Sequence, residues 1–525
     1  MIDKLWYKTR RYIKLLPLLS ILLCTTAYAG RIPAPEFPEN LPWLNVSRPL
    51  TLSDLQGRVT ILDFWTYGCV NCIHVVEELR QLEHQFGDAL VVIGVHSPKF
   101  PNERRLDTLR RILQRYNRQH PIIQDSEQSL MQLYGVRAWP TLMVIDTDGL
   151  VVGYVSGEGH TERLARLIEK LLKEADNSEP APALPLQSDA ARIATQPLAS
   201  PGKIIHSEGD LIISDTLHHR IIIAGIKEKQ FLIIGGGSGG FKDGALKSAR
   251  FSYPQGVIKY ENNLFVADTG NHAVRHIDLT TGQVTTLAGT GKVGYDLNSA
   301  SNAKTIKLRS PWDLALRDRS LYIAMAGSHQ IWRLELDTGE IGPYAGSGGE
   351  GLRNGKLKEA TFSQPSGLAL LGNRLFVTDA EASAIREINL DTEIVTTLVG
   401  RGLFDYGDID GVAGSAKLQH PAGISVLDED HLLIADTYNH KIKSYQLSSG
   451  RVTTLIGSGL PGRGEETLGD SLNEPGGVAA AGDSIWIADT NNDRIIRYER
   501  SSNRLIPWDI PVEKLDAGSP PGKGQ

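Results

Sequence analysis

Between residues 59 and 171, two kinds of hydrophobic pattern alternate along the chain. Short continuous apolar runs are separated by segments in which apolar residues recur at helical spacing, and Asp148-Gly149 is typical of a tight hairpin turn. Strands that alternate with helices and end in a hairpin predict an α/β fold with a mixed central sheet. The apolar runs that predict strands lie at 59–64, 90–95, 122–123, 141–145 and 151–155, and the predicted helices lie near 75–86, 103–117, 130–134 and 164–171.

From residue 198 the pattern changes to short β-rich segments that repeat at a nearly constant spacing. Each unit opens on a proline and reaches an Asp-Thr or related dipeptide at almost the same distance from it. Six such units within 198–512, each with about four strands, predict an all-β six-bladed propeller, because each unit can bury its faces only against its neighbours. The last unit supplies four strands of its own, so the sequence leaves open how the ring closes. The prolines are Pro201, Pro254, Pro311, Pro365, Pro421 and Pro475, and the dipeptides begin at Asp215, Asp268, Met325, Asp379, Asp436 and Asp489.

Composition agrees with a multidomain globular protein. The chain has 525 residues, of which 41% are hydrophobic and 22% charged, and this excludes a mainly disordered chain or a polytopic membrane protein. Residues 176–197 are rich in Ala, Pro, Ser, Asp and Glu and predict a linker between the two patterned regions. Residues 513–525 are expected to form a disordered tail.

Residues 1–29 have the pattern of a secretory signal peptide. Five basic residues precede a short apolar run, and Ala27-Tyr28-Ala29 forms an A-x-A cleavage site before Gly30. We therefore expect a periplasmic or otherwise exported protein. The apolar run has about ten residues where roughly 20 are needed to cross a bilayer, so no stable membrane span is expected after cleavage. An uncleaved anchor is the alternative.

Removal of residues 1–29 changes the charge and the cysteine content. The remaining chain carries 50 Lys and Arg against 60 Asp and Glu, so no basic surface for nucleic acid is expected. Cys24 is lost with the signal peptide, and Cys69 and Cys72 remain as one C-x-x-C pair.

This pair lies where the first predicted strand gives way to a helix. Free backbone N–H groups and the helix dipole favour a thiolate at Cys69, and Cys72 lies one turn later, close enough to form a disulfide with Cys69. The alternatives are a structural disulfide or half of a zinc site. A zinc site needs about four ligands and there is no second cysteine pair, so we expect redox chemistry with no metal and no cofactor.

The segment Asp63–Cys72, DFWTYGCVNC, resembles the thioredoxin superfamily in its exported TlpA-like branch, and specifically the thioredoxin domains fused to NHL-repeat propellers. The resemblance covers residues 50–175, and we place the thioredoxin-like domain at 38–175. It implies that Asp63 is the buried carboxylate that takes a proton from the resolving Cys72. It also implies that Trp65, Trp139, Pro140 (as the family's cis-proline) and Thr141 contact the substrate.

The sequence departs from the family in its active-site surroundings. Val70 and Asn71 stand between the cysteines, so the redox direction stays open among reductase, oxidase and isomerase. The lysine usually found near the buried acid has no equivalent in 91–96, and Asp63 could instead be a structural carboxylate. His74 is expected to be a solvated helix residue.

The repeats resemble NHL repeats. Asp268, Asp436 and Asp489 are interpreted as residues that cap the turn into the next strand. The alternative is a catalytic or metal-binding role for these aspartates and for His272, His329 and His440.

Three functions are compatible with the sequence. The favoured hypothesis is an exported thiol–disulfide oxidoreductase, with Cys69 as nucleophile and Cys72 as resolving cysteine, whose propeller recruits protein clients. The second is a propeller scaffold for protein binding with a non-essential thioredoxin-like domain, and the third is a propeller enzyme of lactonase or lyase type. The client, the redox partner and the propeller's ligand are not determined by the sequence.

Overall fold

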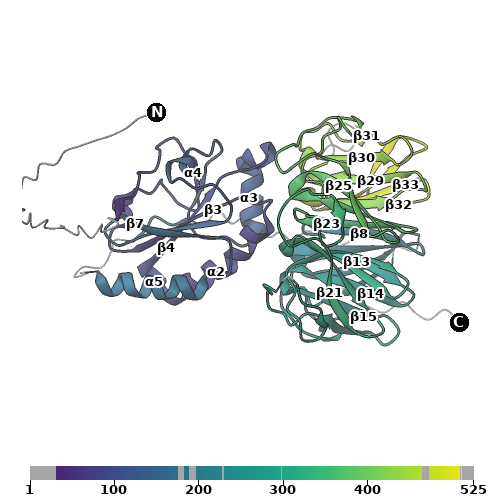
Figure 1. Ribbon diagram of the computed structural model, residues 1–525, viewed down its shortest axis with the longest axis horizontal. Coiled ribbons are helices and arrows are strands. Elements are labelled where there is room, and N and C mark those ends of the chain that lie inside the picture. Colours follow the sequence, from purple (N-terminus) through teal and green to yellow (C-terminus); the bar gives the residue numbers. More distant parts are fainter. Residues whose placement is uncertain are drawn as a thin grey trace, which may run out of the picture.

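The computed structural model describes residues 31–175, 183–187, 197–227, 230–296, 298–463, 472–508 and 510. The predicted signal peptide, the tail and most of the linker lie outside these residues. Two domains lie side by side, an α/β domain and an all-β propeller, which confirms the predicted fold class (Figure 1).

The α/β domain contains a seven-stranded mixed sheet in the order β1-β7-β6-β3-β4-β5-β2. Central β3 pairs parallel to β4 and antiparallel to β6, and both faces of β3 are fully buried, as its continuous apolar run predicts. The strands are β1 (Ile32–Pro33), β2 (Trp43–Leu44), β3 (Val59–Trp65), β4 (Leu90–His96), β5 (Ile122–Gln124), β6 (Thr141–Ile145) and β7 (Leu150–Ser156). The helices are α1 (Leu52–Leu55), α2 (Val70–Phe86), α3 (Leu106–Arg115), α4 (Ser129–Leu133) and α5 (Thr161–Glu174), with 3₁₀ turns η1 (Gly87–Ala89) and η2 (Pro101–Arg104).

The helix predicted near 103–117 is shorter than expected. Its first turn is replaced by η2, because the Glu103 side chain folds back to accept the backbone N–H groups of Lys99 and Phe100 at 2.7 and 3.0 Å. Of the described linker residues, 183–187 belong with the α/β domain, where Leu186 forms a β-bridge with Val46, whereas the main-chain oxygen of Pro197 accepts from Arg220 of the propeller.

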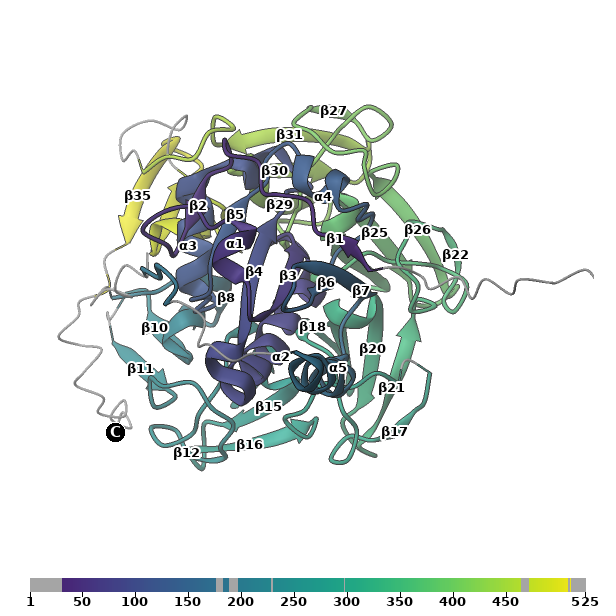
Figure 2. The ribbon, with the colours of Figure 1, turned by 90° about the vertical axis from the view of Figure 1, so that its left-hand side faces the viewer.

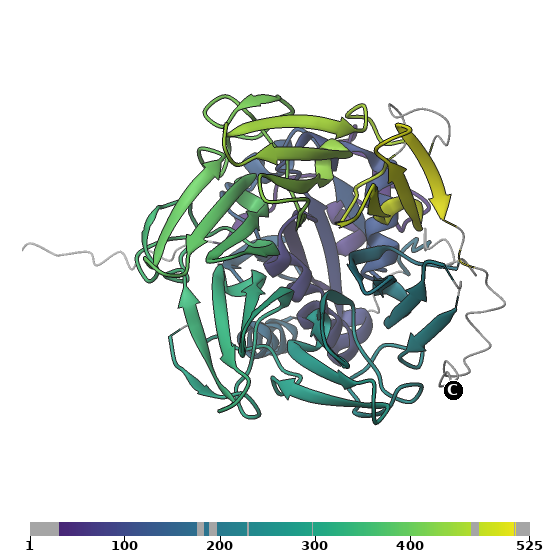
Figure 3. The same ribbon diagram turned by 90° about the vertical axis from the view of Figure 1, so that its right-hand side faces the viewer.

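Six antiparallel sheets form the propeller blades, and Figure 3 shows them around a central axis. The innermost strand of each blade contacts the innermost strands of both neighbours. Blades 2 to 5 each carry an additional short strand at the outer edge, which the sequence did not predict. Blade 1 has β8 (Pro201–Ser207), β9 (Asp210–Asp215), β10 (Arg220–Gly225) and β11 (Phe231–Ile234); blade 2 has β12 (Gly244–Ala245), β13 (Pro254–Tyr260), β14 (Asn263–Asp268), β15 (Ala273–Asp278) and β16 (Gln283–Ala288); blade 3 has β17 (Ser301–Asn302), β18 (Pro311–Arg317), β19 (Ser320–Met325), β20 (Gln330–Glu335) and β21 (Glu340–Ala345). Blade 4 has β22 (Gly355–Lys356), β23 (Pro365–Leu371), β24 (Arg374–Asp379), β25 (Ala384–Asn389) and β26 (Ile394–Val399); blade 5 has β27 (Gly411–Val412), β28 (Gly423–Val426), β29 (His431–Asp436), β30 (Lys441–Gln446) and β31 (Arg451–Ile456); blade 6 has β32 (Gly477–Ala481), β33 (Ser484–Asp489), β34 (Arg494–Glu499) and β35 (Arg504–Trp508).

One repeated hydrogen bond links each blade to the next. A residue in the left-handed conformation after the second strand accepts the backbone N–H of the residue that precedes the next blade's opening proline. The acceptor–donor pairs are His219–Tyr253, His272–Ser310, His329–Gln364, Ser383–His420, His440–Glu474 and Asp493–Ser200, at 2.7 to 3.2 Å. The last pair joins blade 6 to blade 1, so the ring closes through the same contact as every other blade boundary.

The repeat aspartates are structural, but the prediction that they cap the turn into the next strand is wrong, because none of the three side chains accepts a capping backbone N–H from that turn. Asp268, Asp436 and Asp489 each accept a backbone N–H at 2.7 Å from the loop that precedes their blade's innermost strand. At the axis, Lys203 of blade 1 donates at 2.8 Å to the main-chain oxygen of Ser366 in blade 4 and lies 3.4 Å from Asp313 of blade 3. Lys203 also donates to the main-chain oxygen of Ala422 in blade 5 and therefore ties four blades together.

Candidate active site

The cysteine pair lies at the start of α2, at the face of the α/β domain that meets the propeller. Cys69 is the N-cap residue, and its Sγ accepts the backbone N–H of Cys72 at 3.2 Å. The two sulfur atoms lie 2.6 Å apart and are not joined by a disulfide, so a bond between them needs only a small movement. Cys69 is half-buried and Cys72 is fully buried, and burial raises the pKa of the Cys72 thiol well above its usual value.

Asp63 lies beneath the dithiol in a buried ion pair. Its Oδ2 accepts from Arg118 at 2.8 Å, and neither side chain is exposed. Arg118 also donates to the main-chain oxygen of Cys72 at 2.9 Å and lies 3.7 Å from the centre of the Trp65 ring. Arg118 is thus the cation near the buried acid that the sequence did not reveal. It lies beyond both α2 and α3 in the chain, and no local pattern connects it with Asp63.

The predicted substrate-binding residues meet beside the cysteines. Trp65 and Trp139 pack in the same apolar cluster as Cys69 and Cys72. The Trp139–Pro140 peptide bond is cis, and Thr141 opens β6 directly opposite Phe64 of β3. The structure therefore brings all the predicted site residues into one region of the α/β domain.

The propeller contributes six further residues to this region, one from each blade. They are the residues that precede the opening prolines, and we call them the pre-proline ring. Each occupies the same position in its repeat, each has a positive φ, and each lies against the α/β domain. The ring residues and their contacts in the α/β domain are Ser200 with Arg115, Tyr253 with Tyr116, Ser310 with His74, Gln364 with Gly68 and Val70, His420 with Gly68, and Glu474 with Tyr67 and Asn102.

His74 is not a solvated helix residue, and that expectation was wrong. Its Nδ1 bonds Glu158 at 2.6 Å and its Nε2 bonds Ser310 of the ring at 2.5 Å, leaving 10% of the side chain exposed. Glu158 also accepts from Arg309 of the propeller, and its contacts with His74 and Arg309 overcome the effect of burial and lower the pKa of Glu158. The His74 side chain is buried because the propeller docks against α2. The sequence pattern of α2 alone does not predict this contact.

Gly68 has close neighbours from both domains. Its backbone N–H donates to Glu103 at 2.9 Å. A Cβ atom at this position would lie 3.0 Å from carboxylate oxygens of Glu103 and Glu381 and 3.2 Å from the hydroxyl of Tyr438. A Cβ atom here would crowd these three groups, so glycine favours close approach of the propeller to the residue before Cys69.

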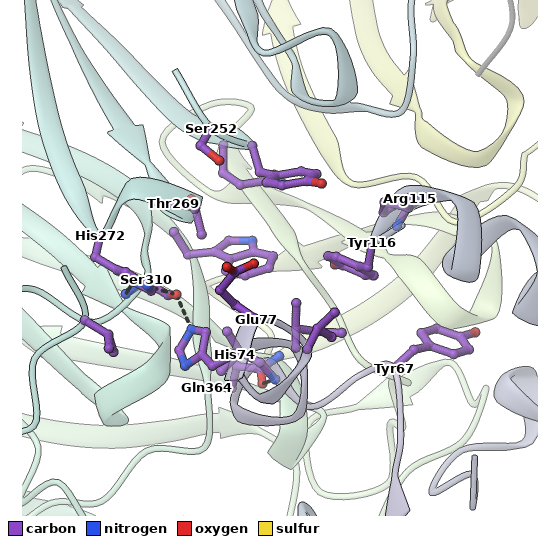
Figure 4. Close-up of a pocket in the computed structure, with 18 of the residues that line it drawn as sticks. Tyr67, His74, Glu77, Arg115, Tyr116, Ser252, Thr269, His272, Ser310 and Gln364 are labelled. Atoms are coloured by element: carbon purple, nitrogen blue, oxygen red, sulfur yellow. Dashed lines mark hydrogen bonds between the residues drawn. The ribbon is translucent and has the colours of Figure 1, made fainter. Parts of the chain in front are cut away.

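A cavity of about 1010 Å³ lies between α2 and the inner surface of the propeller. Its wall includes Gly68 and Val70, which flank Cys69, and it extends to Lys203 near the axis. Figure 4 shows His74, Tyr116 and Gln364 around it, with the hydrogen bond between His74 and Ser310. The α/β domain covers the centre of the propeller face (Figure 2). The cavity enclosed between the two domains therefore lies beside the dithiol.

Two features are absent from the described residues. Their histidines, cysteines and carboxylates include no group of three placed to hold a metal ion. Within the same ranges, none of the helices combines the length and the apolar character that a bilayer crossing requires.

Comparison with known proteins supports both halves of the architecture. The AhpC/TSA family model matches residues 32–154, and the NHL repeat model matches residues 418–445. The chain is 40% identical to NHL repeat-containing protein 2 of Bos taurus over 504 residues, which is 88% of this chain and 69% of that protein. It is 39% identical to Protein SUPPRESSOR OF QUENCHING 1, chloroplastic, of Arabidopsis thaliana over 88% of this chain and 46% of that protein. Over 28% of this chain it is 23% identical to the thiol-disulfide oxidoreductase YkuV of Bacillus subtilis (strain 168), of which 98% is covered.

Proposed function

The chain belongs to the NHL repeat-containing protein 2 family, and from this premise we propose that it is an exported thiol–disulfide oxidoreductase whose propeller recruits protein clients. The observation that carries the proposal is the dithiol at the start of α2, with one half-buried and one fully buried sulfur beside a large cavity. The similarity of the α/β domain to a thiol-disulfide oxidoreductase supports it.

In the reducing direction, the thiolate of Cys69 attacks one sulfur of a client disulfide. The other client sulfur leaves as a thiolate and takes a proton from water, and Cys69 stays joined to the client as a mixed disulfide. The Cys72 thiol must then lose its proton, which burial opposes. We assign Asp63 as the acceptor, because its Oδ1 is buried and accepts no hydrogen bond from the described residues.

The Cys72 thiolate next attacks Cys69 Sγ and releases the client as a dithiol. The protein is left with a Cys69–Cys72 disulfide, which a separate dithiol redox partner must reduce before the next cycle. In the oxidising direction the same bonds form and break in reverse order. The geometry supports either direction, and the reduction potential of the pair decides between them.

The pre-proline ring supports a role for the propeller in client binding. Because the ring lies against the α/β domain, a client that enters the cavity beside Gly68 and Val70 contacts both domains. The cavity wall combines aromatic rings (Tyr116, Tyr253 and Trp312) with charged groups (Glu77 and Arg115), a mixture suited to a peptide segment.

The test uses the full mature chain with Cys72→Ser. This variant should accumulate mixed disulfides with exported proteins, while Cys69→Ser and the double variant should accumulate none. Wild-type protein should also exchange with a small aromatic disulfide. If Cys72→Ser traps nothing and the wild-type chain shows no exchange, the proposed function is wrong.

A further inference from the structure

The start of α2 has few backbone donors, and a residue of the propeller takes one of them. The first N–H groups of a helix have no partner within the helix and stabilise negative charge nearby. At this terminus the N–H of Cys72 points to Cys69 Sγ at 3.2 Å. The N–H of Val70, which directly follows Cys69, instead donates to Oε1 of Gln364 at 2.7 Å.

Gln364 binds the peptide groups on both sides of Cys69. Its Nε2 donates to the main-chain oxygen of Gly68 at 2.7 Å, while its Oε1 accepts from Val70. The residue is 3% exposed, and its own backbone N–H is held by His329 at 3.1 Å. The propeller thus fixes the backbone of Gln364, from which the carboxamide reaches the α/β domain.

We propose that Gln364 is a positioning residue for disulfide exchange, and that it sets the reactivity of Cys69 by binding the Val70 N–H, one of the backbone donors whose partial positive charge favours a thiolate at this helix start. This inference rests on the proposed function. The carboxamide oxygen of Gln364 offsets the partial positive charge of this N–H, so the propeller moderates the activation that the helix start would otherwise give. The neighbouring peptide groups are also held rigid, which keeps Cys69 in one orientation.

Other charged groups around Cys69 set the background for this effect. Asp63 and Arg118 lie on the Cys72 side of the dithiol. On the Gly68 side are Glu103 from η2 and Glu381 from blade 4, which is paired with Lys99. His420 of blade 5 lies 3.3 Å from the main-chain oxygen of Gly68 and 3.4 Å from Nε2 of Gln364. A neutral substitution at Gln364 leaves all of these charges in place.

The experiment compares the pH profile of Cys69 alkylation in the full reduced chain, followed by mass spectrometry of the Cys69 peptide. Gln364→Met keeps the side-chain length and removes both hydrogen bonds. The midpoint of its profile should move about half a unit to lower pH, which makes alkylation about three-fold faster well below the midpoint. Gln364→Ala should move the midpoint in the same direction.

Gln419→Met is the matched control. Gln419 is a buried glutamine of the same propeller that bonds Asn439 at 2.7 Å, and its substitution should leave the midpoint unchanged. A loosened domain contact would raise the alkylation rate at every pH without moving the midpoint. An unmoved midpoint in both Gln364 variants, or an equal shift in Gln419→Met, overturns the proposal. Exchange of a small disulfide by the wild-type chain is measured in parallel, so a failure of the proposed function is recognised separately.

Discussion

Lys99 of the α/β domain donates to Glu381 of the propeller twice, to the main-chain oxygen at 2.8 Å and to the carboxylate at 2.5 Å. The two side chains are only 5% and 8% exposed. Removal of one partner from a buried ion pair leaves the other charge uncompensated, which costs about 3–5 kcal/mol. The contact between the domains therefore depends strongly on this pair.

We expect Lys99→Met to weaken the docking of the two domains by about 3–5 kcal/mol. In calorimetry, this loss should separate the unfolding of the α/β domain from that of the propeller. Lys356→Met, on the exposed outer strand β22, should leave the calorimetric profile unchanged. The combination of Lys99→Met with Glu381→Gln should recover part of the loss, and equal profiles for all variants would contradict the prediction.

Closure of the propeller ring is tested at Asp493, whose Oδ1 accepts the backbone N–H of Ser200 at 2.7 Å. Asp493 has a φ of 55°, a conformation that Asn tolerates and Ala resists. Asp493→Ala should lower the free energy of unfolding in urea by about 2 kcal/mol, whereas Asp493→Asn should stay within about 0.5 kcal/mol of wild type. Equal losses in the two variants would show that the accepted hydrogen bond does not hold the ring closed.

The histidines that link the blades predict a pH-dependent contribution to stability. Burial lowers the pKa of His272 to about 3 and of His329 to about 4, so both stay neutral when folded and accept a backbone N–H. The unfolded chain binds their protons below pH ~6.5 and the folded chain does not. Each histidine therefore makes its full contribution to the free energy of unfolding above that pH. At pH 5 this contribution is smaller by about 2 kcal/mol.

Buried aspartates act in the opposite direction, since burial raises the pKa of Asp268 and Asp436 to about 6. The measurement must therefore be a difference between variants. His329→Asn should be less stable than wild type at pH 7.5, and the gap should shrink by about 2 kcal/mol at pH 5. A gap that is the same at both pH values would mean that His329 titrates alike in the folded and unfolded chains.

Asp63→Asn tests the second step of exchange. Asn retains an oxygen for Arg118 but accepts no proton, so deprotonation of Cys72 should slow and the mixed disulfide at Cys69 should persist. Acid quenching during reaction with a client peptide should show this species rising at least about ten-fold over wild type. If it decays at the wild-type rate, Asp63 is a structural partner of Arg118 and not the proton acceptor.

Local patterns were sufficient to predict both domains and the position of the dithiol. The buried strands of the α/β domain are visible as continuous apolar runs. The six propeller units repeat the same turn residues at regular spacing. Both folds can therefore be predicted from short segments of sequence. The additional outer strands of blades 2 to 5, such as β12 (Gly244–Ala245), are too short to leave a hydrophobic period.

The propeller's part of the site could not be predicted from these patterns. Gln364 precedes a proline in a position that reads as a turn, and His74 lies on a helix face that reads as solvated. Each of these interpretations uses the sequence pattern of a single domain and takes no account of the other domain. The roles of these residues follow from the docking of two surfaces, which depends on shape and charge between segments that lie far apart in the sequence.

The pre-proline ring has a consequence for the evolution and engineering of this protein. One backbone geometry is repeated six times, yet the side chains that it presents are Ser, Tyr, Ser, Gln, His and Glu. The scaffold of the propeller is symmetric, but the surface that it presents is not. The order of these six side chains, together with contacts such as Lys99–Glu381, therefore selects its rotational position on the thioredoxin-like domain. A chain with its blades shuffled could keep every link between neighbouring blades and still close. It would present those six side chains in the wrong order to a domain that fits only one rotation.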